Sequence, residues 1–172
     1  MSQLPEPSEQ EIASAKVPHD IFLSNLIGNH ILLFTAIATF GSSYMKYLVM
    51  VPLLSFAALA YTYYRSGKVK REDSEFIWAH WQVARRWSKF FFMMLMLLVT
   101  VSTLGWLGKT YLGMMKEAVY AMIGGLGILP TLVSVLVLIV IESDSLHHAR
   151  VGTLPKWALR RFLGIESAPT QD

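Results

Sequence analysis

The sequence predicts an all-α polytopic membrane protein: a four-transmembrane-helix bundle with a cytoplasmic amphipathic extension before the third span and a short interfacial C-terminal helix. Only 16% of the 172 residues are charged and 53% are hydrophobic, whereas a soluble domain is usually about 25% charged. The charges also cluster in the N-terminal tail, in residues 65–89 and after residue 141. Long uncharged runs between such clusters are typical of membrane-spanning helices.

Four segments are close to the length of about 20 apolar residues that a spanning helix needs. The expected spans are 21–41, 47–64, 88–108 and 118–142. The second is the shortest, and the polar "SSYMK" before it favours a turn between two antiparallel helices. The predicted domains are therefore a cytoplasmic N-terminal arm at 1–20, a four-helix membrane domain at 21–164 and a mobile C-terminal tail at 165–172.

The distribution of Lys and Arg predicts the orientation, because cytoplasmic loops carry an excess of both. One side would hold both termini and the 65–89 loop, with Lys16, Arg65, Lys68, Lys70, Arg71, Arg85, Arg86, Lys89, Arg150, Lys156, Arg160 and Arg161. The other side would hold Lys46, Lys109 and Lys116. Both termini are therefore expected to be cytoplasmic. This asymmetry and the absence of cysteine favour a bacterial inner membrane, and an organelle membrane stays open.

Two amphipathic segments are expected on the cytoplasmic side. In "SEFIWAHWQVARRWSKFFFMM" one narrow stripe at 100° per residue contains Phe76, His80, Val83, Trp87, Phe90 and Met94. Ser74 is a suitable N-cap, so the third helix should begin well before the bilayer. The segment "TLPKWALRRFLG" predicts a short interfacial helix, with Thr153 as its cap, Pro155 in its first turn and Gly164 at its end.

A polar patch interrupts the first span at Asn25, Asn29 and His30. Asn25 and Asn29 are four residues apart and share a helix face, and His30 lies beside that face. The favoured interpretation is hydrogen bonding between helices, worth about 0.6 kcal/mol per contact. The functional alternative makes His30 and Asn29 cofactor-binding residues that contact a quinone, a haem or a solute.

Depth along the helices argues against a haem whose ligands all come from this chain. At a rise of 1.5 Å per residue, His30 lies roughly 12 Å inside the cytoplasmic boundary and His80 roughly 12 Å outside it. No histidine of another span lies at the depth of His30. A haem shared with a partner stays open.

The segment "IESDSLHHARVG" raises the hypothesis of a metal site. Helix spacing places Asp144 beside both His147 and His148, and His80 is expected at a similar height, as are His19, Asp20 and Glu142. Imidazole and carboxylate ligands suit zinc or iron, so the predicted ligand set is His80, Asp144, His147 and His148. The favoured interpretation is simpler, because cationic side chains are favourable at a helix C-terminus and Gly152 is a natural stop.

The fourth span carries "GGLG" at 124–127, followed by Pro130. Glycines permit close approach of a neighbouring helix, and Pro130 should kink the helix. Packing within the bundle is the favoured interpretation, and a docking face for a partner helix is the alternative.

These features favour a non-catalytic integral subunit of a larger inner-membrane assembly. No Asp, Glu, Lys or Arg lies within the apolar cores of the spans, and the loops are too short for a catalytic domain. The expected partners are the lipid bilayer and other membrane-protein subunits or further copies of this chain. Docking would use the cytoplasmic face and the Gly-rich fourth helix. Nucleic acid is not expected, because the cations flank apolar segments.

Two alternatives stay open. The first is an enzyme or redox subunit that binds a metal or redox cofactor at the cytoplasmic His/Asp cluster. The second is a small transporter or channel lined by Asn25, Asn29, His30, Ser55, Thr103 and Ser134.

Overall fold

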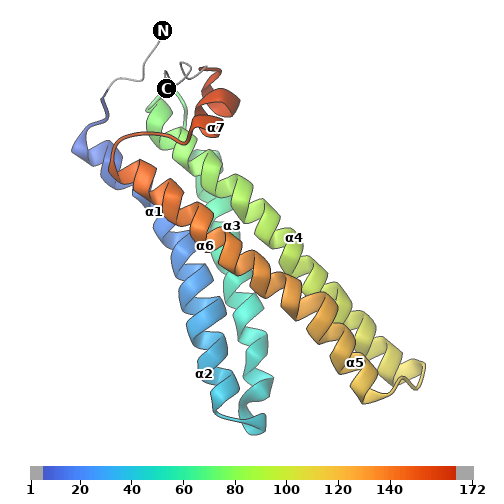
Figure 1. Cartoon of the computed structure of the whole chain (residues 1–172). Helices are drawn as coiled ribbons and strands as arrows, with labels where there is room; N and C mark the ends of the chain where they lie inside the picture. The colour runs from blue at the N-terminus through green and yellow to red at the C-terminus, as the bar shows by residue number, and fades with distance from the viewer. Residues whose placement is uncertain (1–5, 166–172) are drawn as a thin grey trace, which may run out of the picture.

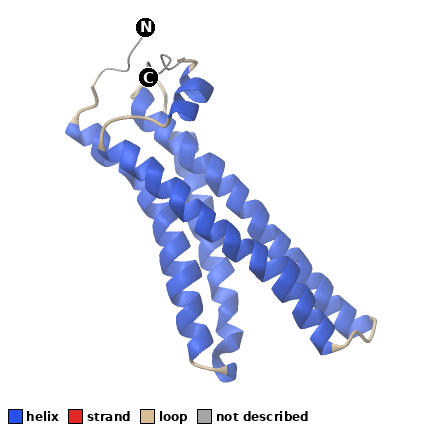
Figure 2. Cartoon of the chain, viewed as in Figure 1, coloured by secondary structure: helices blue, strands red, loops and turns tan. Residues whose placement is uncertain are grey.

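Four long helices run back and forth between the two ends of an elongated bundle (Figure 1). The computed structural model describes residues 6–165, which contain helices and connecting loops but no strand (Figure 2). Four helical stretches are long and apolar enough to cross a membrane, namely Glu9–Thr39, Lys46–Lys68, Glu75–Tyr111 and Lys116–Arg150. The predicted all-α bundle with four candidate spans is confirmed. We call the end with both termini the termini end and the opposite end the turn end.

The first long helix begins at Glu9, although the sequence predicted an arm over residues 1–20. It consists of α1 (Glu9–Leu23), a π-helical segment (Ser24–Leu33) and α2 (Phe34–Thr39). A capping box starts it: Ser8 Oγ accepts from the Glu11 amide at 3.3 Å, and the Glu11 carboxylate accepts from the Ser8 amide at 2.9 Å. Because α1 contacts α4 and α6 and buries Ala15, this part of the chain is packed in the bundle.

The second and third helices agree more closely with the prediction. A 3₁₀ segment (Ser42–Val49) leads into α3 (Met50–Lys68), and α4 spans Glu75–Tyr111. Ser74 caps α4 as expected, since its Oγ accepts from the Ile77 amide at 3.3 Å. The 37 residues of α4 correspond to roughly 55 Å, which exceeds a hydrocarbon core of about 30 Å.

The fourth helix contains α5 (Lys116–Met122), a π-helical segment (Ile123–Ile128) and α6 (Leu129–Arg150). Pro130 lies in the first turn of α6, so the wide π-helical turns come immediately before the proline. Proline lacks an amide hydrogen and its ring collides with the carbonyl four residues earlier, which disturbs α-helical pairing there. At the other end, α6 ends at Arg150, two residues before Gly152. Gly152, the predicted helix stop, has a φ of 71°.

The glycines of "GGLG" face different surroundings. A Cβ on Gly127 would lie 2.9 Å from Leu98 Cδ1, whereas a Cβ on Gly125 would meet no atom within 4 Å. Gly127, in the π-helical segment before α6, is therefore a packing glycine against α4. We expect Gly127→Val to lower the free energy of unfolding by about 1–3 kcal/mol through overpacking. Gly125→Val, the matched control, should leave stability unchanged in a detergent unfolding titration, and equal losses in both variants would contradict this assignment.

The C-terminal segment differs from the prediction at its start. The short helix α7 (Lys156–Ala158) continues as a π-helical turn (Leu159–Leu163), and its N-cap residue is Pro155. Thr153 does not cap this helix, because its hydroxyl instead pairs with His148 Nδ1 at 2.8 Å. Gly164, with a φ of 70°, ends the segment as predicted. The tail predicted over 165–172 lies, apart from Ile165, outside the described residues.

The bundle consists of two helical hairpins that pack together toward the termini end and diverge toward the turn end (Figure 1). One hairpin contains α1, α2 and α3, and the other contains α4, α5 and α6. Residues from all four long helices form a shared core, namely Phe22, Leu26, Leu59, Phe91, Leu95, Val135 and Leu138. Beyond this core, α2 packs on the 3₁₀ segment of its own hairpin, and α5 packs on α4.

Candidate functional site

A chain of buried hydrogen bonds joins three helices near the termini end. His19 of α1, His80 of α4 and Glu142 of α6 each have no exposed surface. His19 Nδ1 lies 2.6 Å from Glu142 Oε2, and His19 Nε2 lies 2.9 Å from His80 Nδ1. His80 Nε2 lies 3.1 Å from the carbonyl oxygen of Thr153, which is the last member of this hydrogen-bond network.

The acceptor at one end of this chain determines where the hydrogens are. A carbonyl oxygen only accepts, so His80 Nε2 donates to Thr153. Full burial disfavours a charged His80, so its Nδ1 accepts from His19 Nε2. One hydrogen then remains between His19 Nδ1 and Glu142 Oε2, and their 2.6 Å separation is as short as a charge-assisted hydrogen bond. The network can therefore hold one shared proton between α1 and α6.

The surroundings of the network are tightly packed. The ring of Phe76 meets the His80 ring edge to face, with centroids 4.8 Å apart. Buried alanines on α1, α4 and α6 (Ala15, Ala79 and Ala149) allow the three helices to approach closely. Glu142 Oε1 is buried without a hydrogen-bond partner among residues 6–165. The hydrogen bonds follow one another in a line and do not converge on one point. This arrangement suits a structural link that holds α1, α4 and α6 together, which we call the clamp.

The structure places the four predicted metal ligands in different surroundings. Asp144 Oδ2 lies 3.9 Å from His148 Nε2, and the rings of His147 and His148 are 6.2 Å apart. His80 is directed into the buried network instead. In the part of the chain that the structure describes, no three His, Asp or Glu side chains are arranged to hold a metal ion. The Asp144–His148 pair agrees with the interpretation of a polar helix end.

Two residues of the polar patch of the first span, Asn25 and Asn29, face α3. Asn25 Nδ2 donates to Ser55 Oγ at 2.9 Å, and Asn29 Nδ2 donates to the Val51 carbonyl at 2.7 Å. These are the predicted hydrogen bonds between helices. The π-helical winding also matters, because i→i+5 bonding places His30 one turn after Asn25. As a result, Asn25, Asn29 and His30 are all buried.

His30 has an unusual position. Its ring meets the Phe91 ring edge to face, with centroids 4.9 Å apart, and only 4% of the residue is exposed. Within the described residues, neither His30 Nε2 nor the neighbouring Asn29 Oδ1 has a hydrogen-bond partner. Buried polar atoms are usually paired, so these two atoms suggest a missing partner.

An apolar cleft of about 340 Å³ contains His30. It is lined by residues of all four long helices, among them Phe34, Val51, Pro52, Leu98, Ser102 and Thr131. Since these residues belong to both hairpins, the cleft lies between them. His30 is the one ionisable side chain among its described lining residues.

Two residues of the predicted channel, His30 and Thr103, line this cleft. Ser55 is bonded to Asn25, and the hydroxyl of Ser134 donates to the Thr131 carbonyl of its own helix. The His19–Glu142 pairing was not predicted. Counting residues along the helices placed His19 and Glu142 at the same height in the bundle. That count could not show that their side chains face each other.

No protein-family model, curated protein or solved structure matches this chain. Its candidate function therefore depends on the geometry of its own side chains.

Proposed function

We propose that this chain is a non-catalytic integral subunit of a larger inner-membrane assembly, and that a transmembrane segment of a partner subunit docks in the cleft between its two hairpins. Both termini would be cytoplasmic, and the cytoplasmic face and the Gly-rich fourth helix would add further contacts. The observation that carries the proposal is the apolar cleft lined by His30, whose Nε2 has no hydrogen-bond partner within residues 6–165.

An unpaired buried polar atom costs about 1–3 kcal/mol, so a partner that supplies hydrogen bonds would remove this cost. Polar side chains bond across helices in membranes, and small residues let helices approach. Gly124 and Gly125 add such a surface, because a Cβ on either would meet no atom within 4 Å.

Site-specific cross-linking in native membranes tests this proposal. The chain has no cysteine, so an introduced cysteine supplies its only thiol. A cross-linker with a thiol-reactive group and a photoreactive group can therefore be attached at one chosen position of the chain. Ser102→Cys places it on the lining of the cleft. Leu104→Cys, on the same helix and 56% exposed, is the control outside the cleft. We expect a cross-linked product with one defined second protein from Ser102→Cys alone, whereas no product, or the same products from both variants, would contradict the proposal.

The same unpaired atom supports a second candidate, in which the cleft holds a lipid-soluble ligand with a polar head, such as a quinone. His30 Nε2, on the lining of the cleft, would then hydrogen-bond to the head group. Organic extraction of the purified chain, followed by mass spectrometry, distinguishes the two candidates. A stoichiometric small molecule without a partner protein favours the ligand, and a stoichiometric partner favours the subunit.

A further inference from the structure

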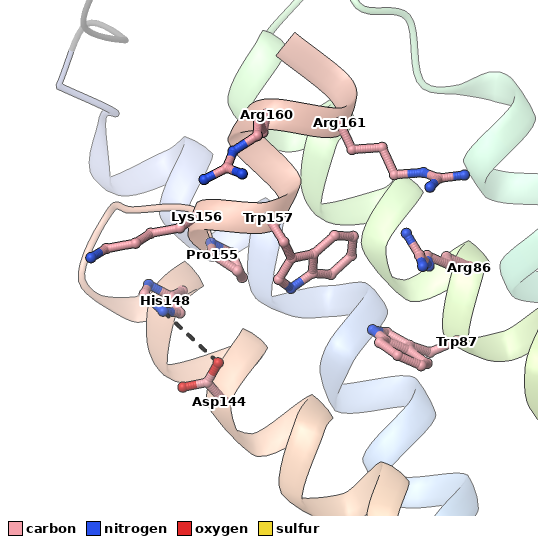
Figure 3. A pocket seen from close by; sticks show the side chains of 9 residues that line it. All are labelled: Arg86, Trp87, Asp144, His148, Pro155, Lys156, Trp157, Arg160 and Arg161. Atoms are coloured by element: carbon pink, nitrogen blue, oxygen red, sulfur yellow. Dashed lines mark ion pairs between the residues drawn. The ribbon is translucent and has the colours of Figure 1, made fainter. Parts of the chain in front are cut away.

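A second hollow lies at the termini end, between α4, α6 and the α7 segment. This groove of about 840 Å³ is open to the surroundings. Four cationic side chains line it, namely Arg86, Lys156, Arg160 and Arg161. The carboxylate on its lining is Asp144, which lies 3.9 Å from His148 Nε2 (Figure 3). The groove therefore carries a net positive charge.

The cations of the groove are not neutralised by acidic neighbours. None of the four forms an ion pair with a carboxylate within residues 6–165. Arg86 is instead held by aromatic rings: its guanidinium lies 5.0 Å from the Trp157 ring centroid and 5.6 Å from that of Trp87. A guanidinium held by ring faces keeps its N–H donors available for an anion.

Tryptophan adds a further donor. Trp87 and Trp157 meet edge to face, with centroids 6.2 Å apart, and both line the groove (Figure 3). Trp87 Nε1 is buried and has no acceptor in the described part of the chain. An indole N–H only donates, so this atom requires an acceptor such as a phosphate oxygen.

An exposed apolar strip leads from the groove toward the turn end. Phe90 follows Arg86 by one helical turn on α4, and Val140 and Val137 precede Asp144 by one and two turns on α6. These side chains are 38%, 70% and 51% exposed. A cationic groove that continues into an exposed apolar surface suits an amphiphile rather than a soluble anion.

We propose that this groove is a binding site for an anionic phospholipid. Its phosphodiester head group would contact Arg86, Arg160, Arg161 and Trp87 Nε1, and its acyl chains would lie along the apolar strip. Basic pockets between transmembrane helices on the cytoplasmic side recognise such head groups, and tryptophan is enriched at this depth. The site is separate from the cleft at His30 and does not depend on what occupies that cleft.

Native mass spectrometry of the full chain in mild detergent, titrated with phosphatidylglycerol or phosphatidylcholine, tests the site. We expect the wild-type chain to retain phosphatidylglycerol roughly tenfold or more above phosphatidylcholine. The triple variant Arg86→Gln, Arg160→Gln, Arg161→Gln should weaken phosphatidylglycerol binding by roughly a hundredfold. All three side chains are exposed, so the fold should tolerate the change.

The triple variant Lys68→Gln, Lys70→Gln, Arg150→Gln is the matched control, since it removes the same charge from exposed positions that do not line the groove. It should retain phosphatidylglycerol within about threefold of wild type, because screened charges outside the groove contribute little. Equal losses in both triple variants, or equal retention of the two lipids, would overturn the proposal. Displacement of the lipid by equimolar inorganic phosphate would overturn it too, and would indicate a soluble phosphate ligand.

Discussion

Glu142→Leu is expected to lower the free energy of unfolding by about 1–3 kcal/mol, because it removes one partner of a buried hydrogen bond. His19 Nδ1, now 2.6 Å from Glu142 Oε2, would remain buried without a partner. The chain of bonds to His80 and Thr153 would lose its end on α6. A detergent unfolding titration followed by circular dichroism measures the loss, and a Glu142→Leu variant as stable as wild type would contradict the clamp.

Glu142→Gln is the control with nearly the same shape. Its amide N–H can donate to His19 Nδ1, so the hydrogens on His19 Nε2 and His80 Nε2 keep their places. We expect this variant to retain most of the stability that Glu142→Leu loses. If both substitutions cost the same, the carboxylate charge rather than the hydrogen bond stabilises the pair.

His30→Leu is expected to separate assembly from folding. In the isolated chain, stability should not fall by more than about 1 kcal/mol, because the substitution removes a buried nitrogen that has no partner within residues 6–165. Recovery of the partner subunit should fall by roughly threefold to twentyfold, the equivalent of one interhelical hydrogen bond in a membrane. Quantitative mass spectrometry of the mild-detergent preparation, beside an unfolding titration of the isolated variant, measures both.

Leu32→Ala is the matched control, since Leu32 lies on the same π-helical segment but is 63% exposed. It should change neither stability nor partner recovery. If His30→Leu destabilises the isolated chain strongly and leaves the partner bound, His30 is a packing residue and the cleft is not the docking site.

The four spans could be predicted because the bilayer imposes a length on each apolar run. The start of the first helix could not be predicted from the length of an apolar run. Glu9 and Glu11 make its first turns polar, and Pro18 interrupts the helical sequence pattern. A local signal was present in Ser8 and Glu11, three residues apart, which form the capping box that starts α1. Pro18 is tolerated within this packed helix.

The candidate site was only partly predictable. Residue counting placed His19, His80 and Glu142 at one height because helix rise is regular. Their rotation toward each other depends on packing, and helices that are apolar on all sides give little rotational signal. The position of His30 depends on the π-helical winding of Ser24–Leu33, which periodicity at 3.6 residues per turn does not reveal.

The measurement that tests the subunit proposal most directly is purification of the wild-type chain from its native cells in mild detergent, with quantitative mass spectrometry of all proteins that stay bound. We predict defined membrane partners at a fixed ratio, one of them the protein that the Ser102→Cys variant cross-links. A chain that purifies alone, with its cleft cross-linked to no protein, would contradict the proposal.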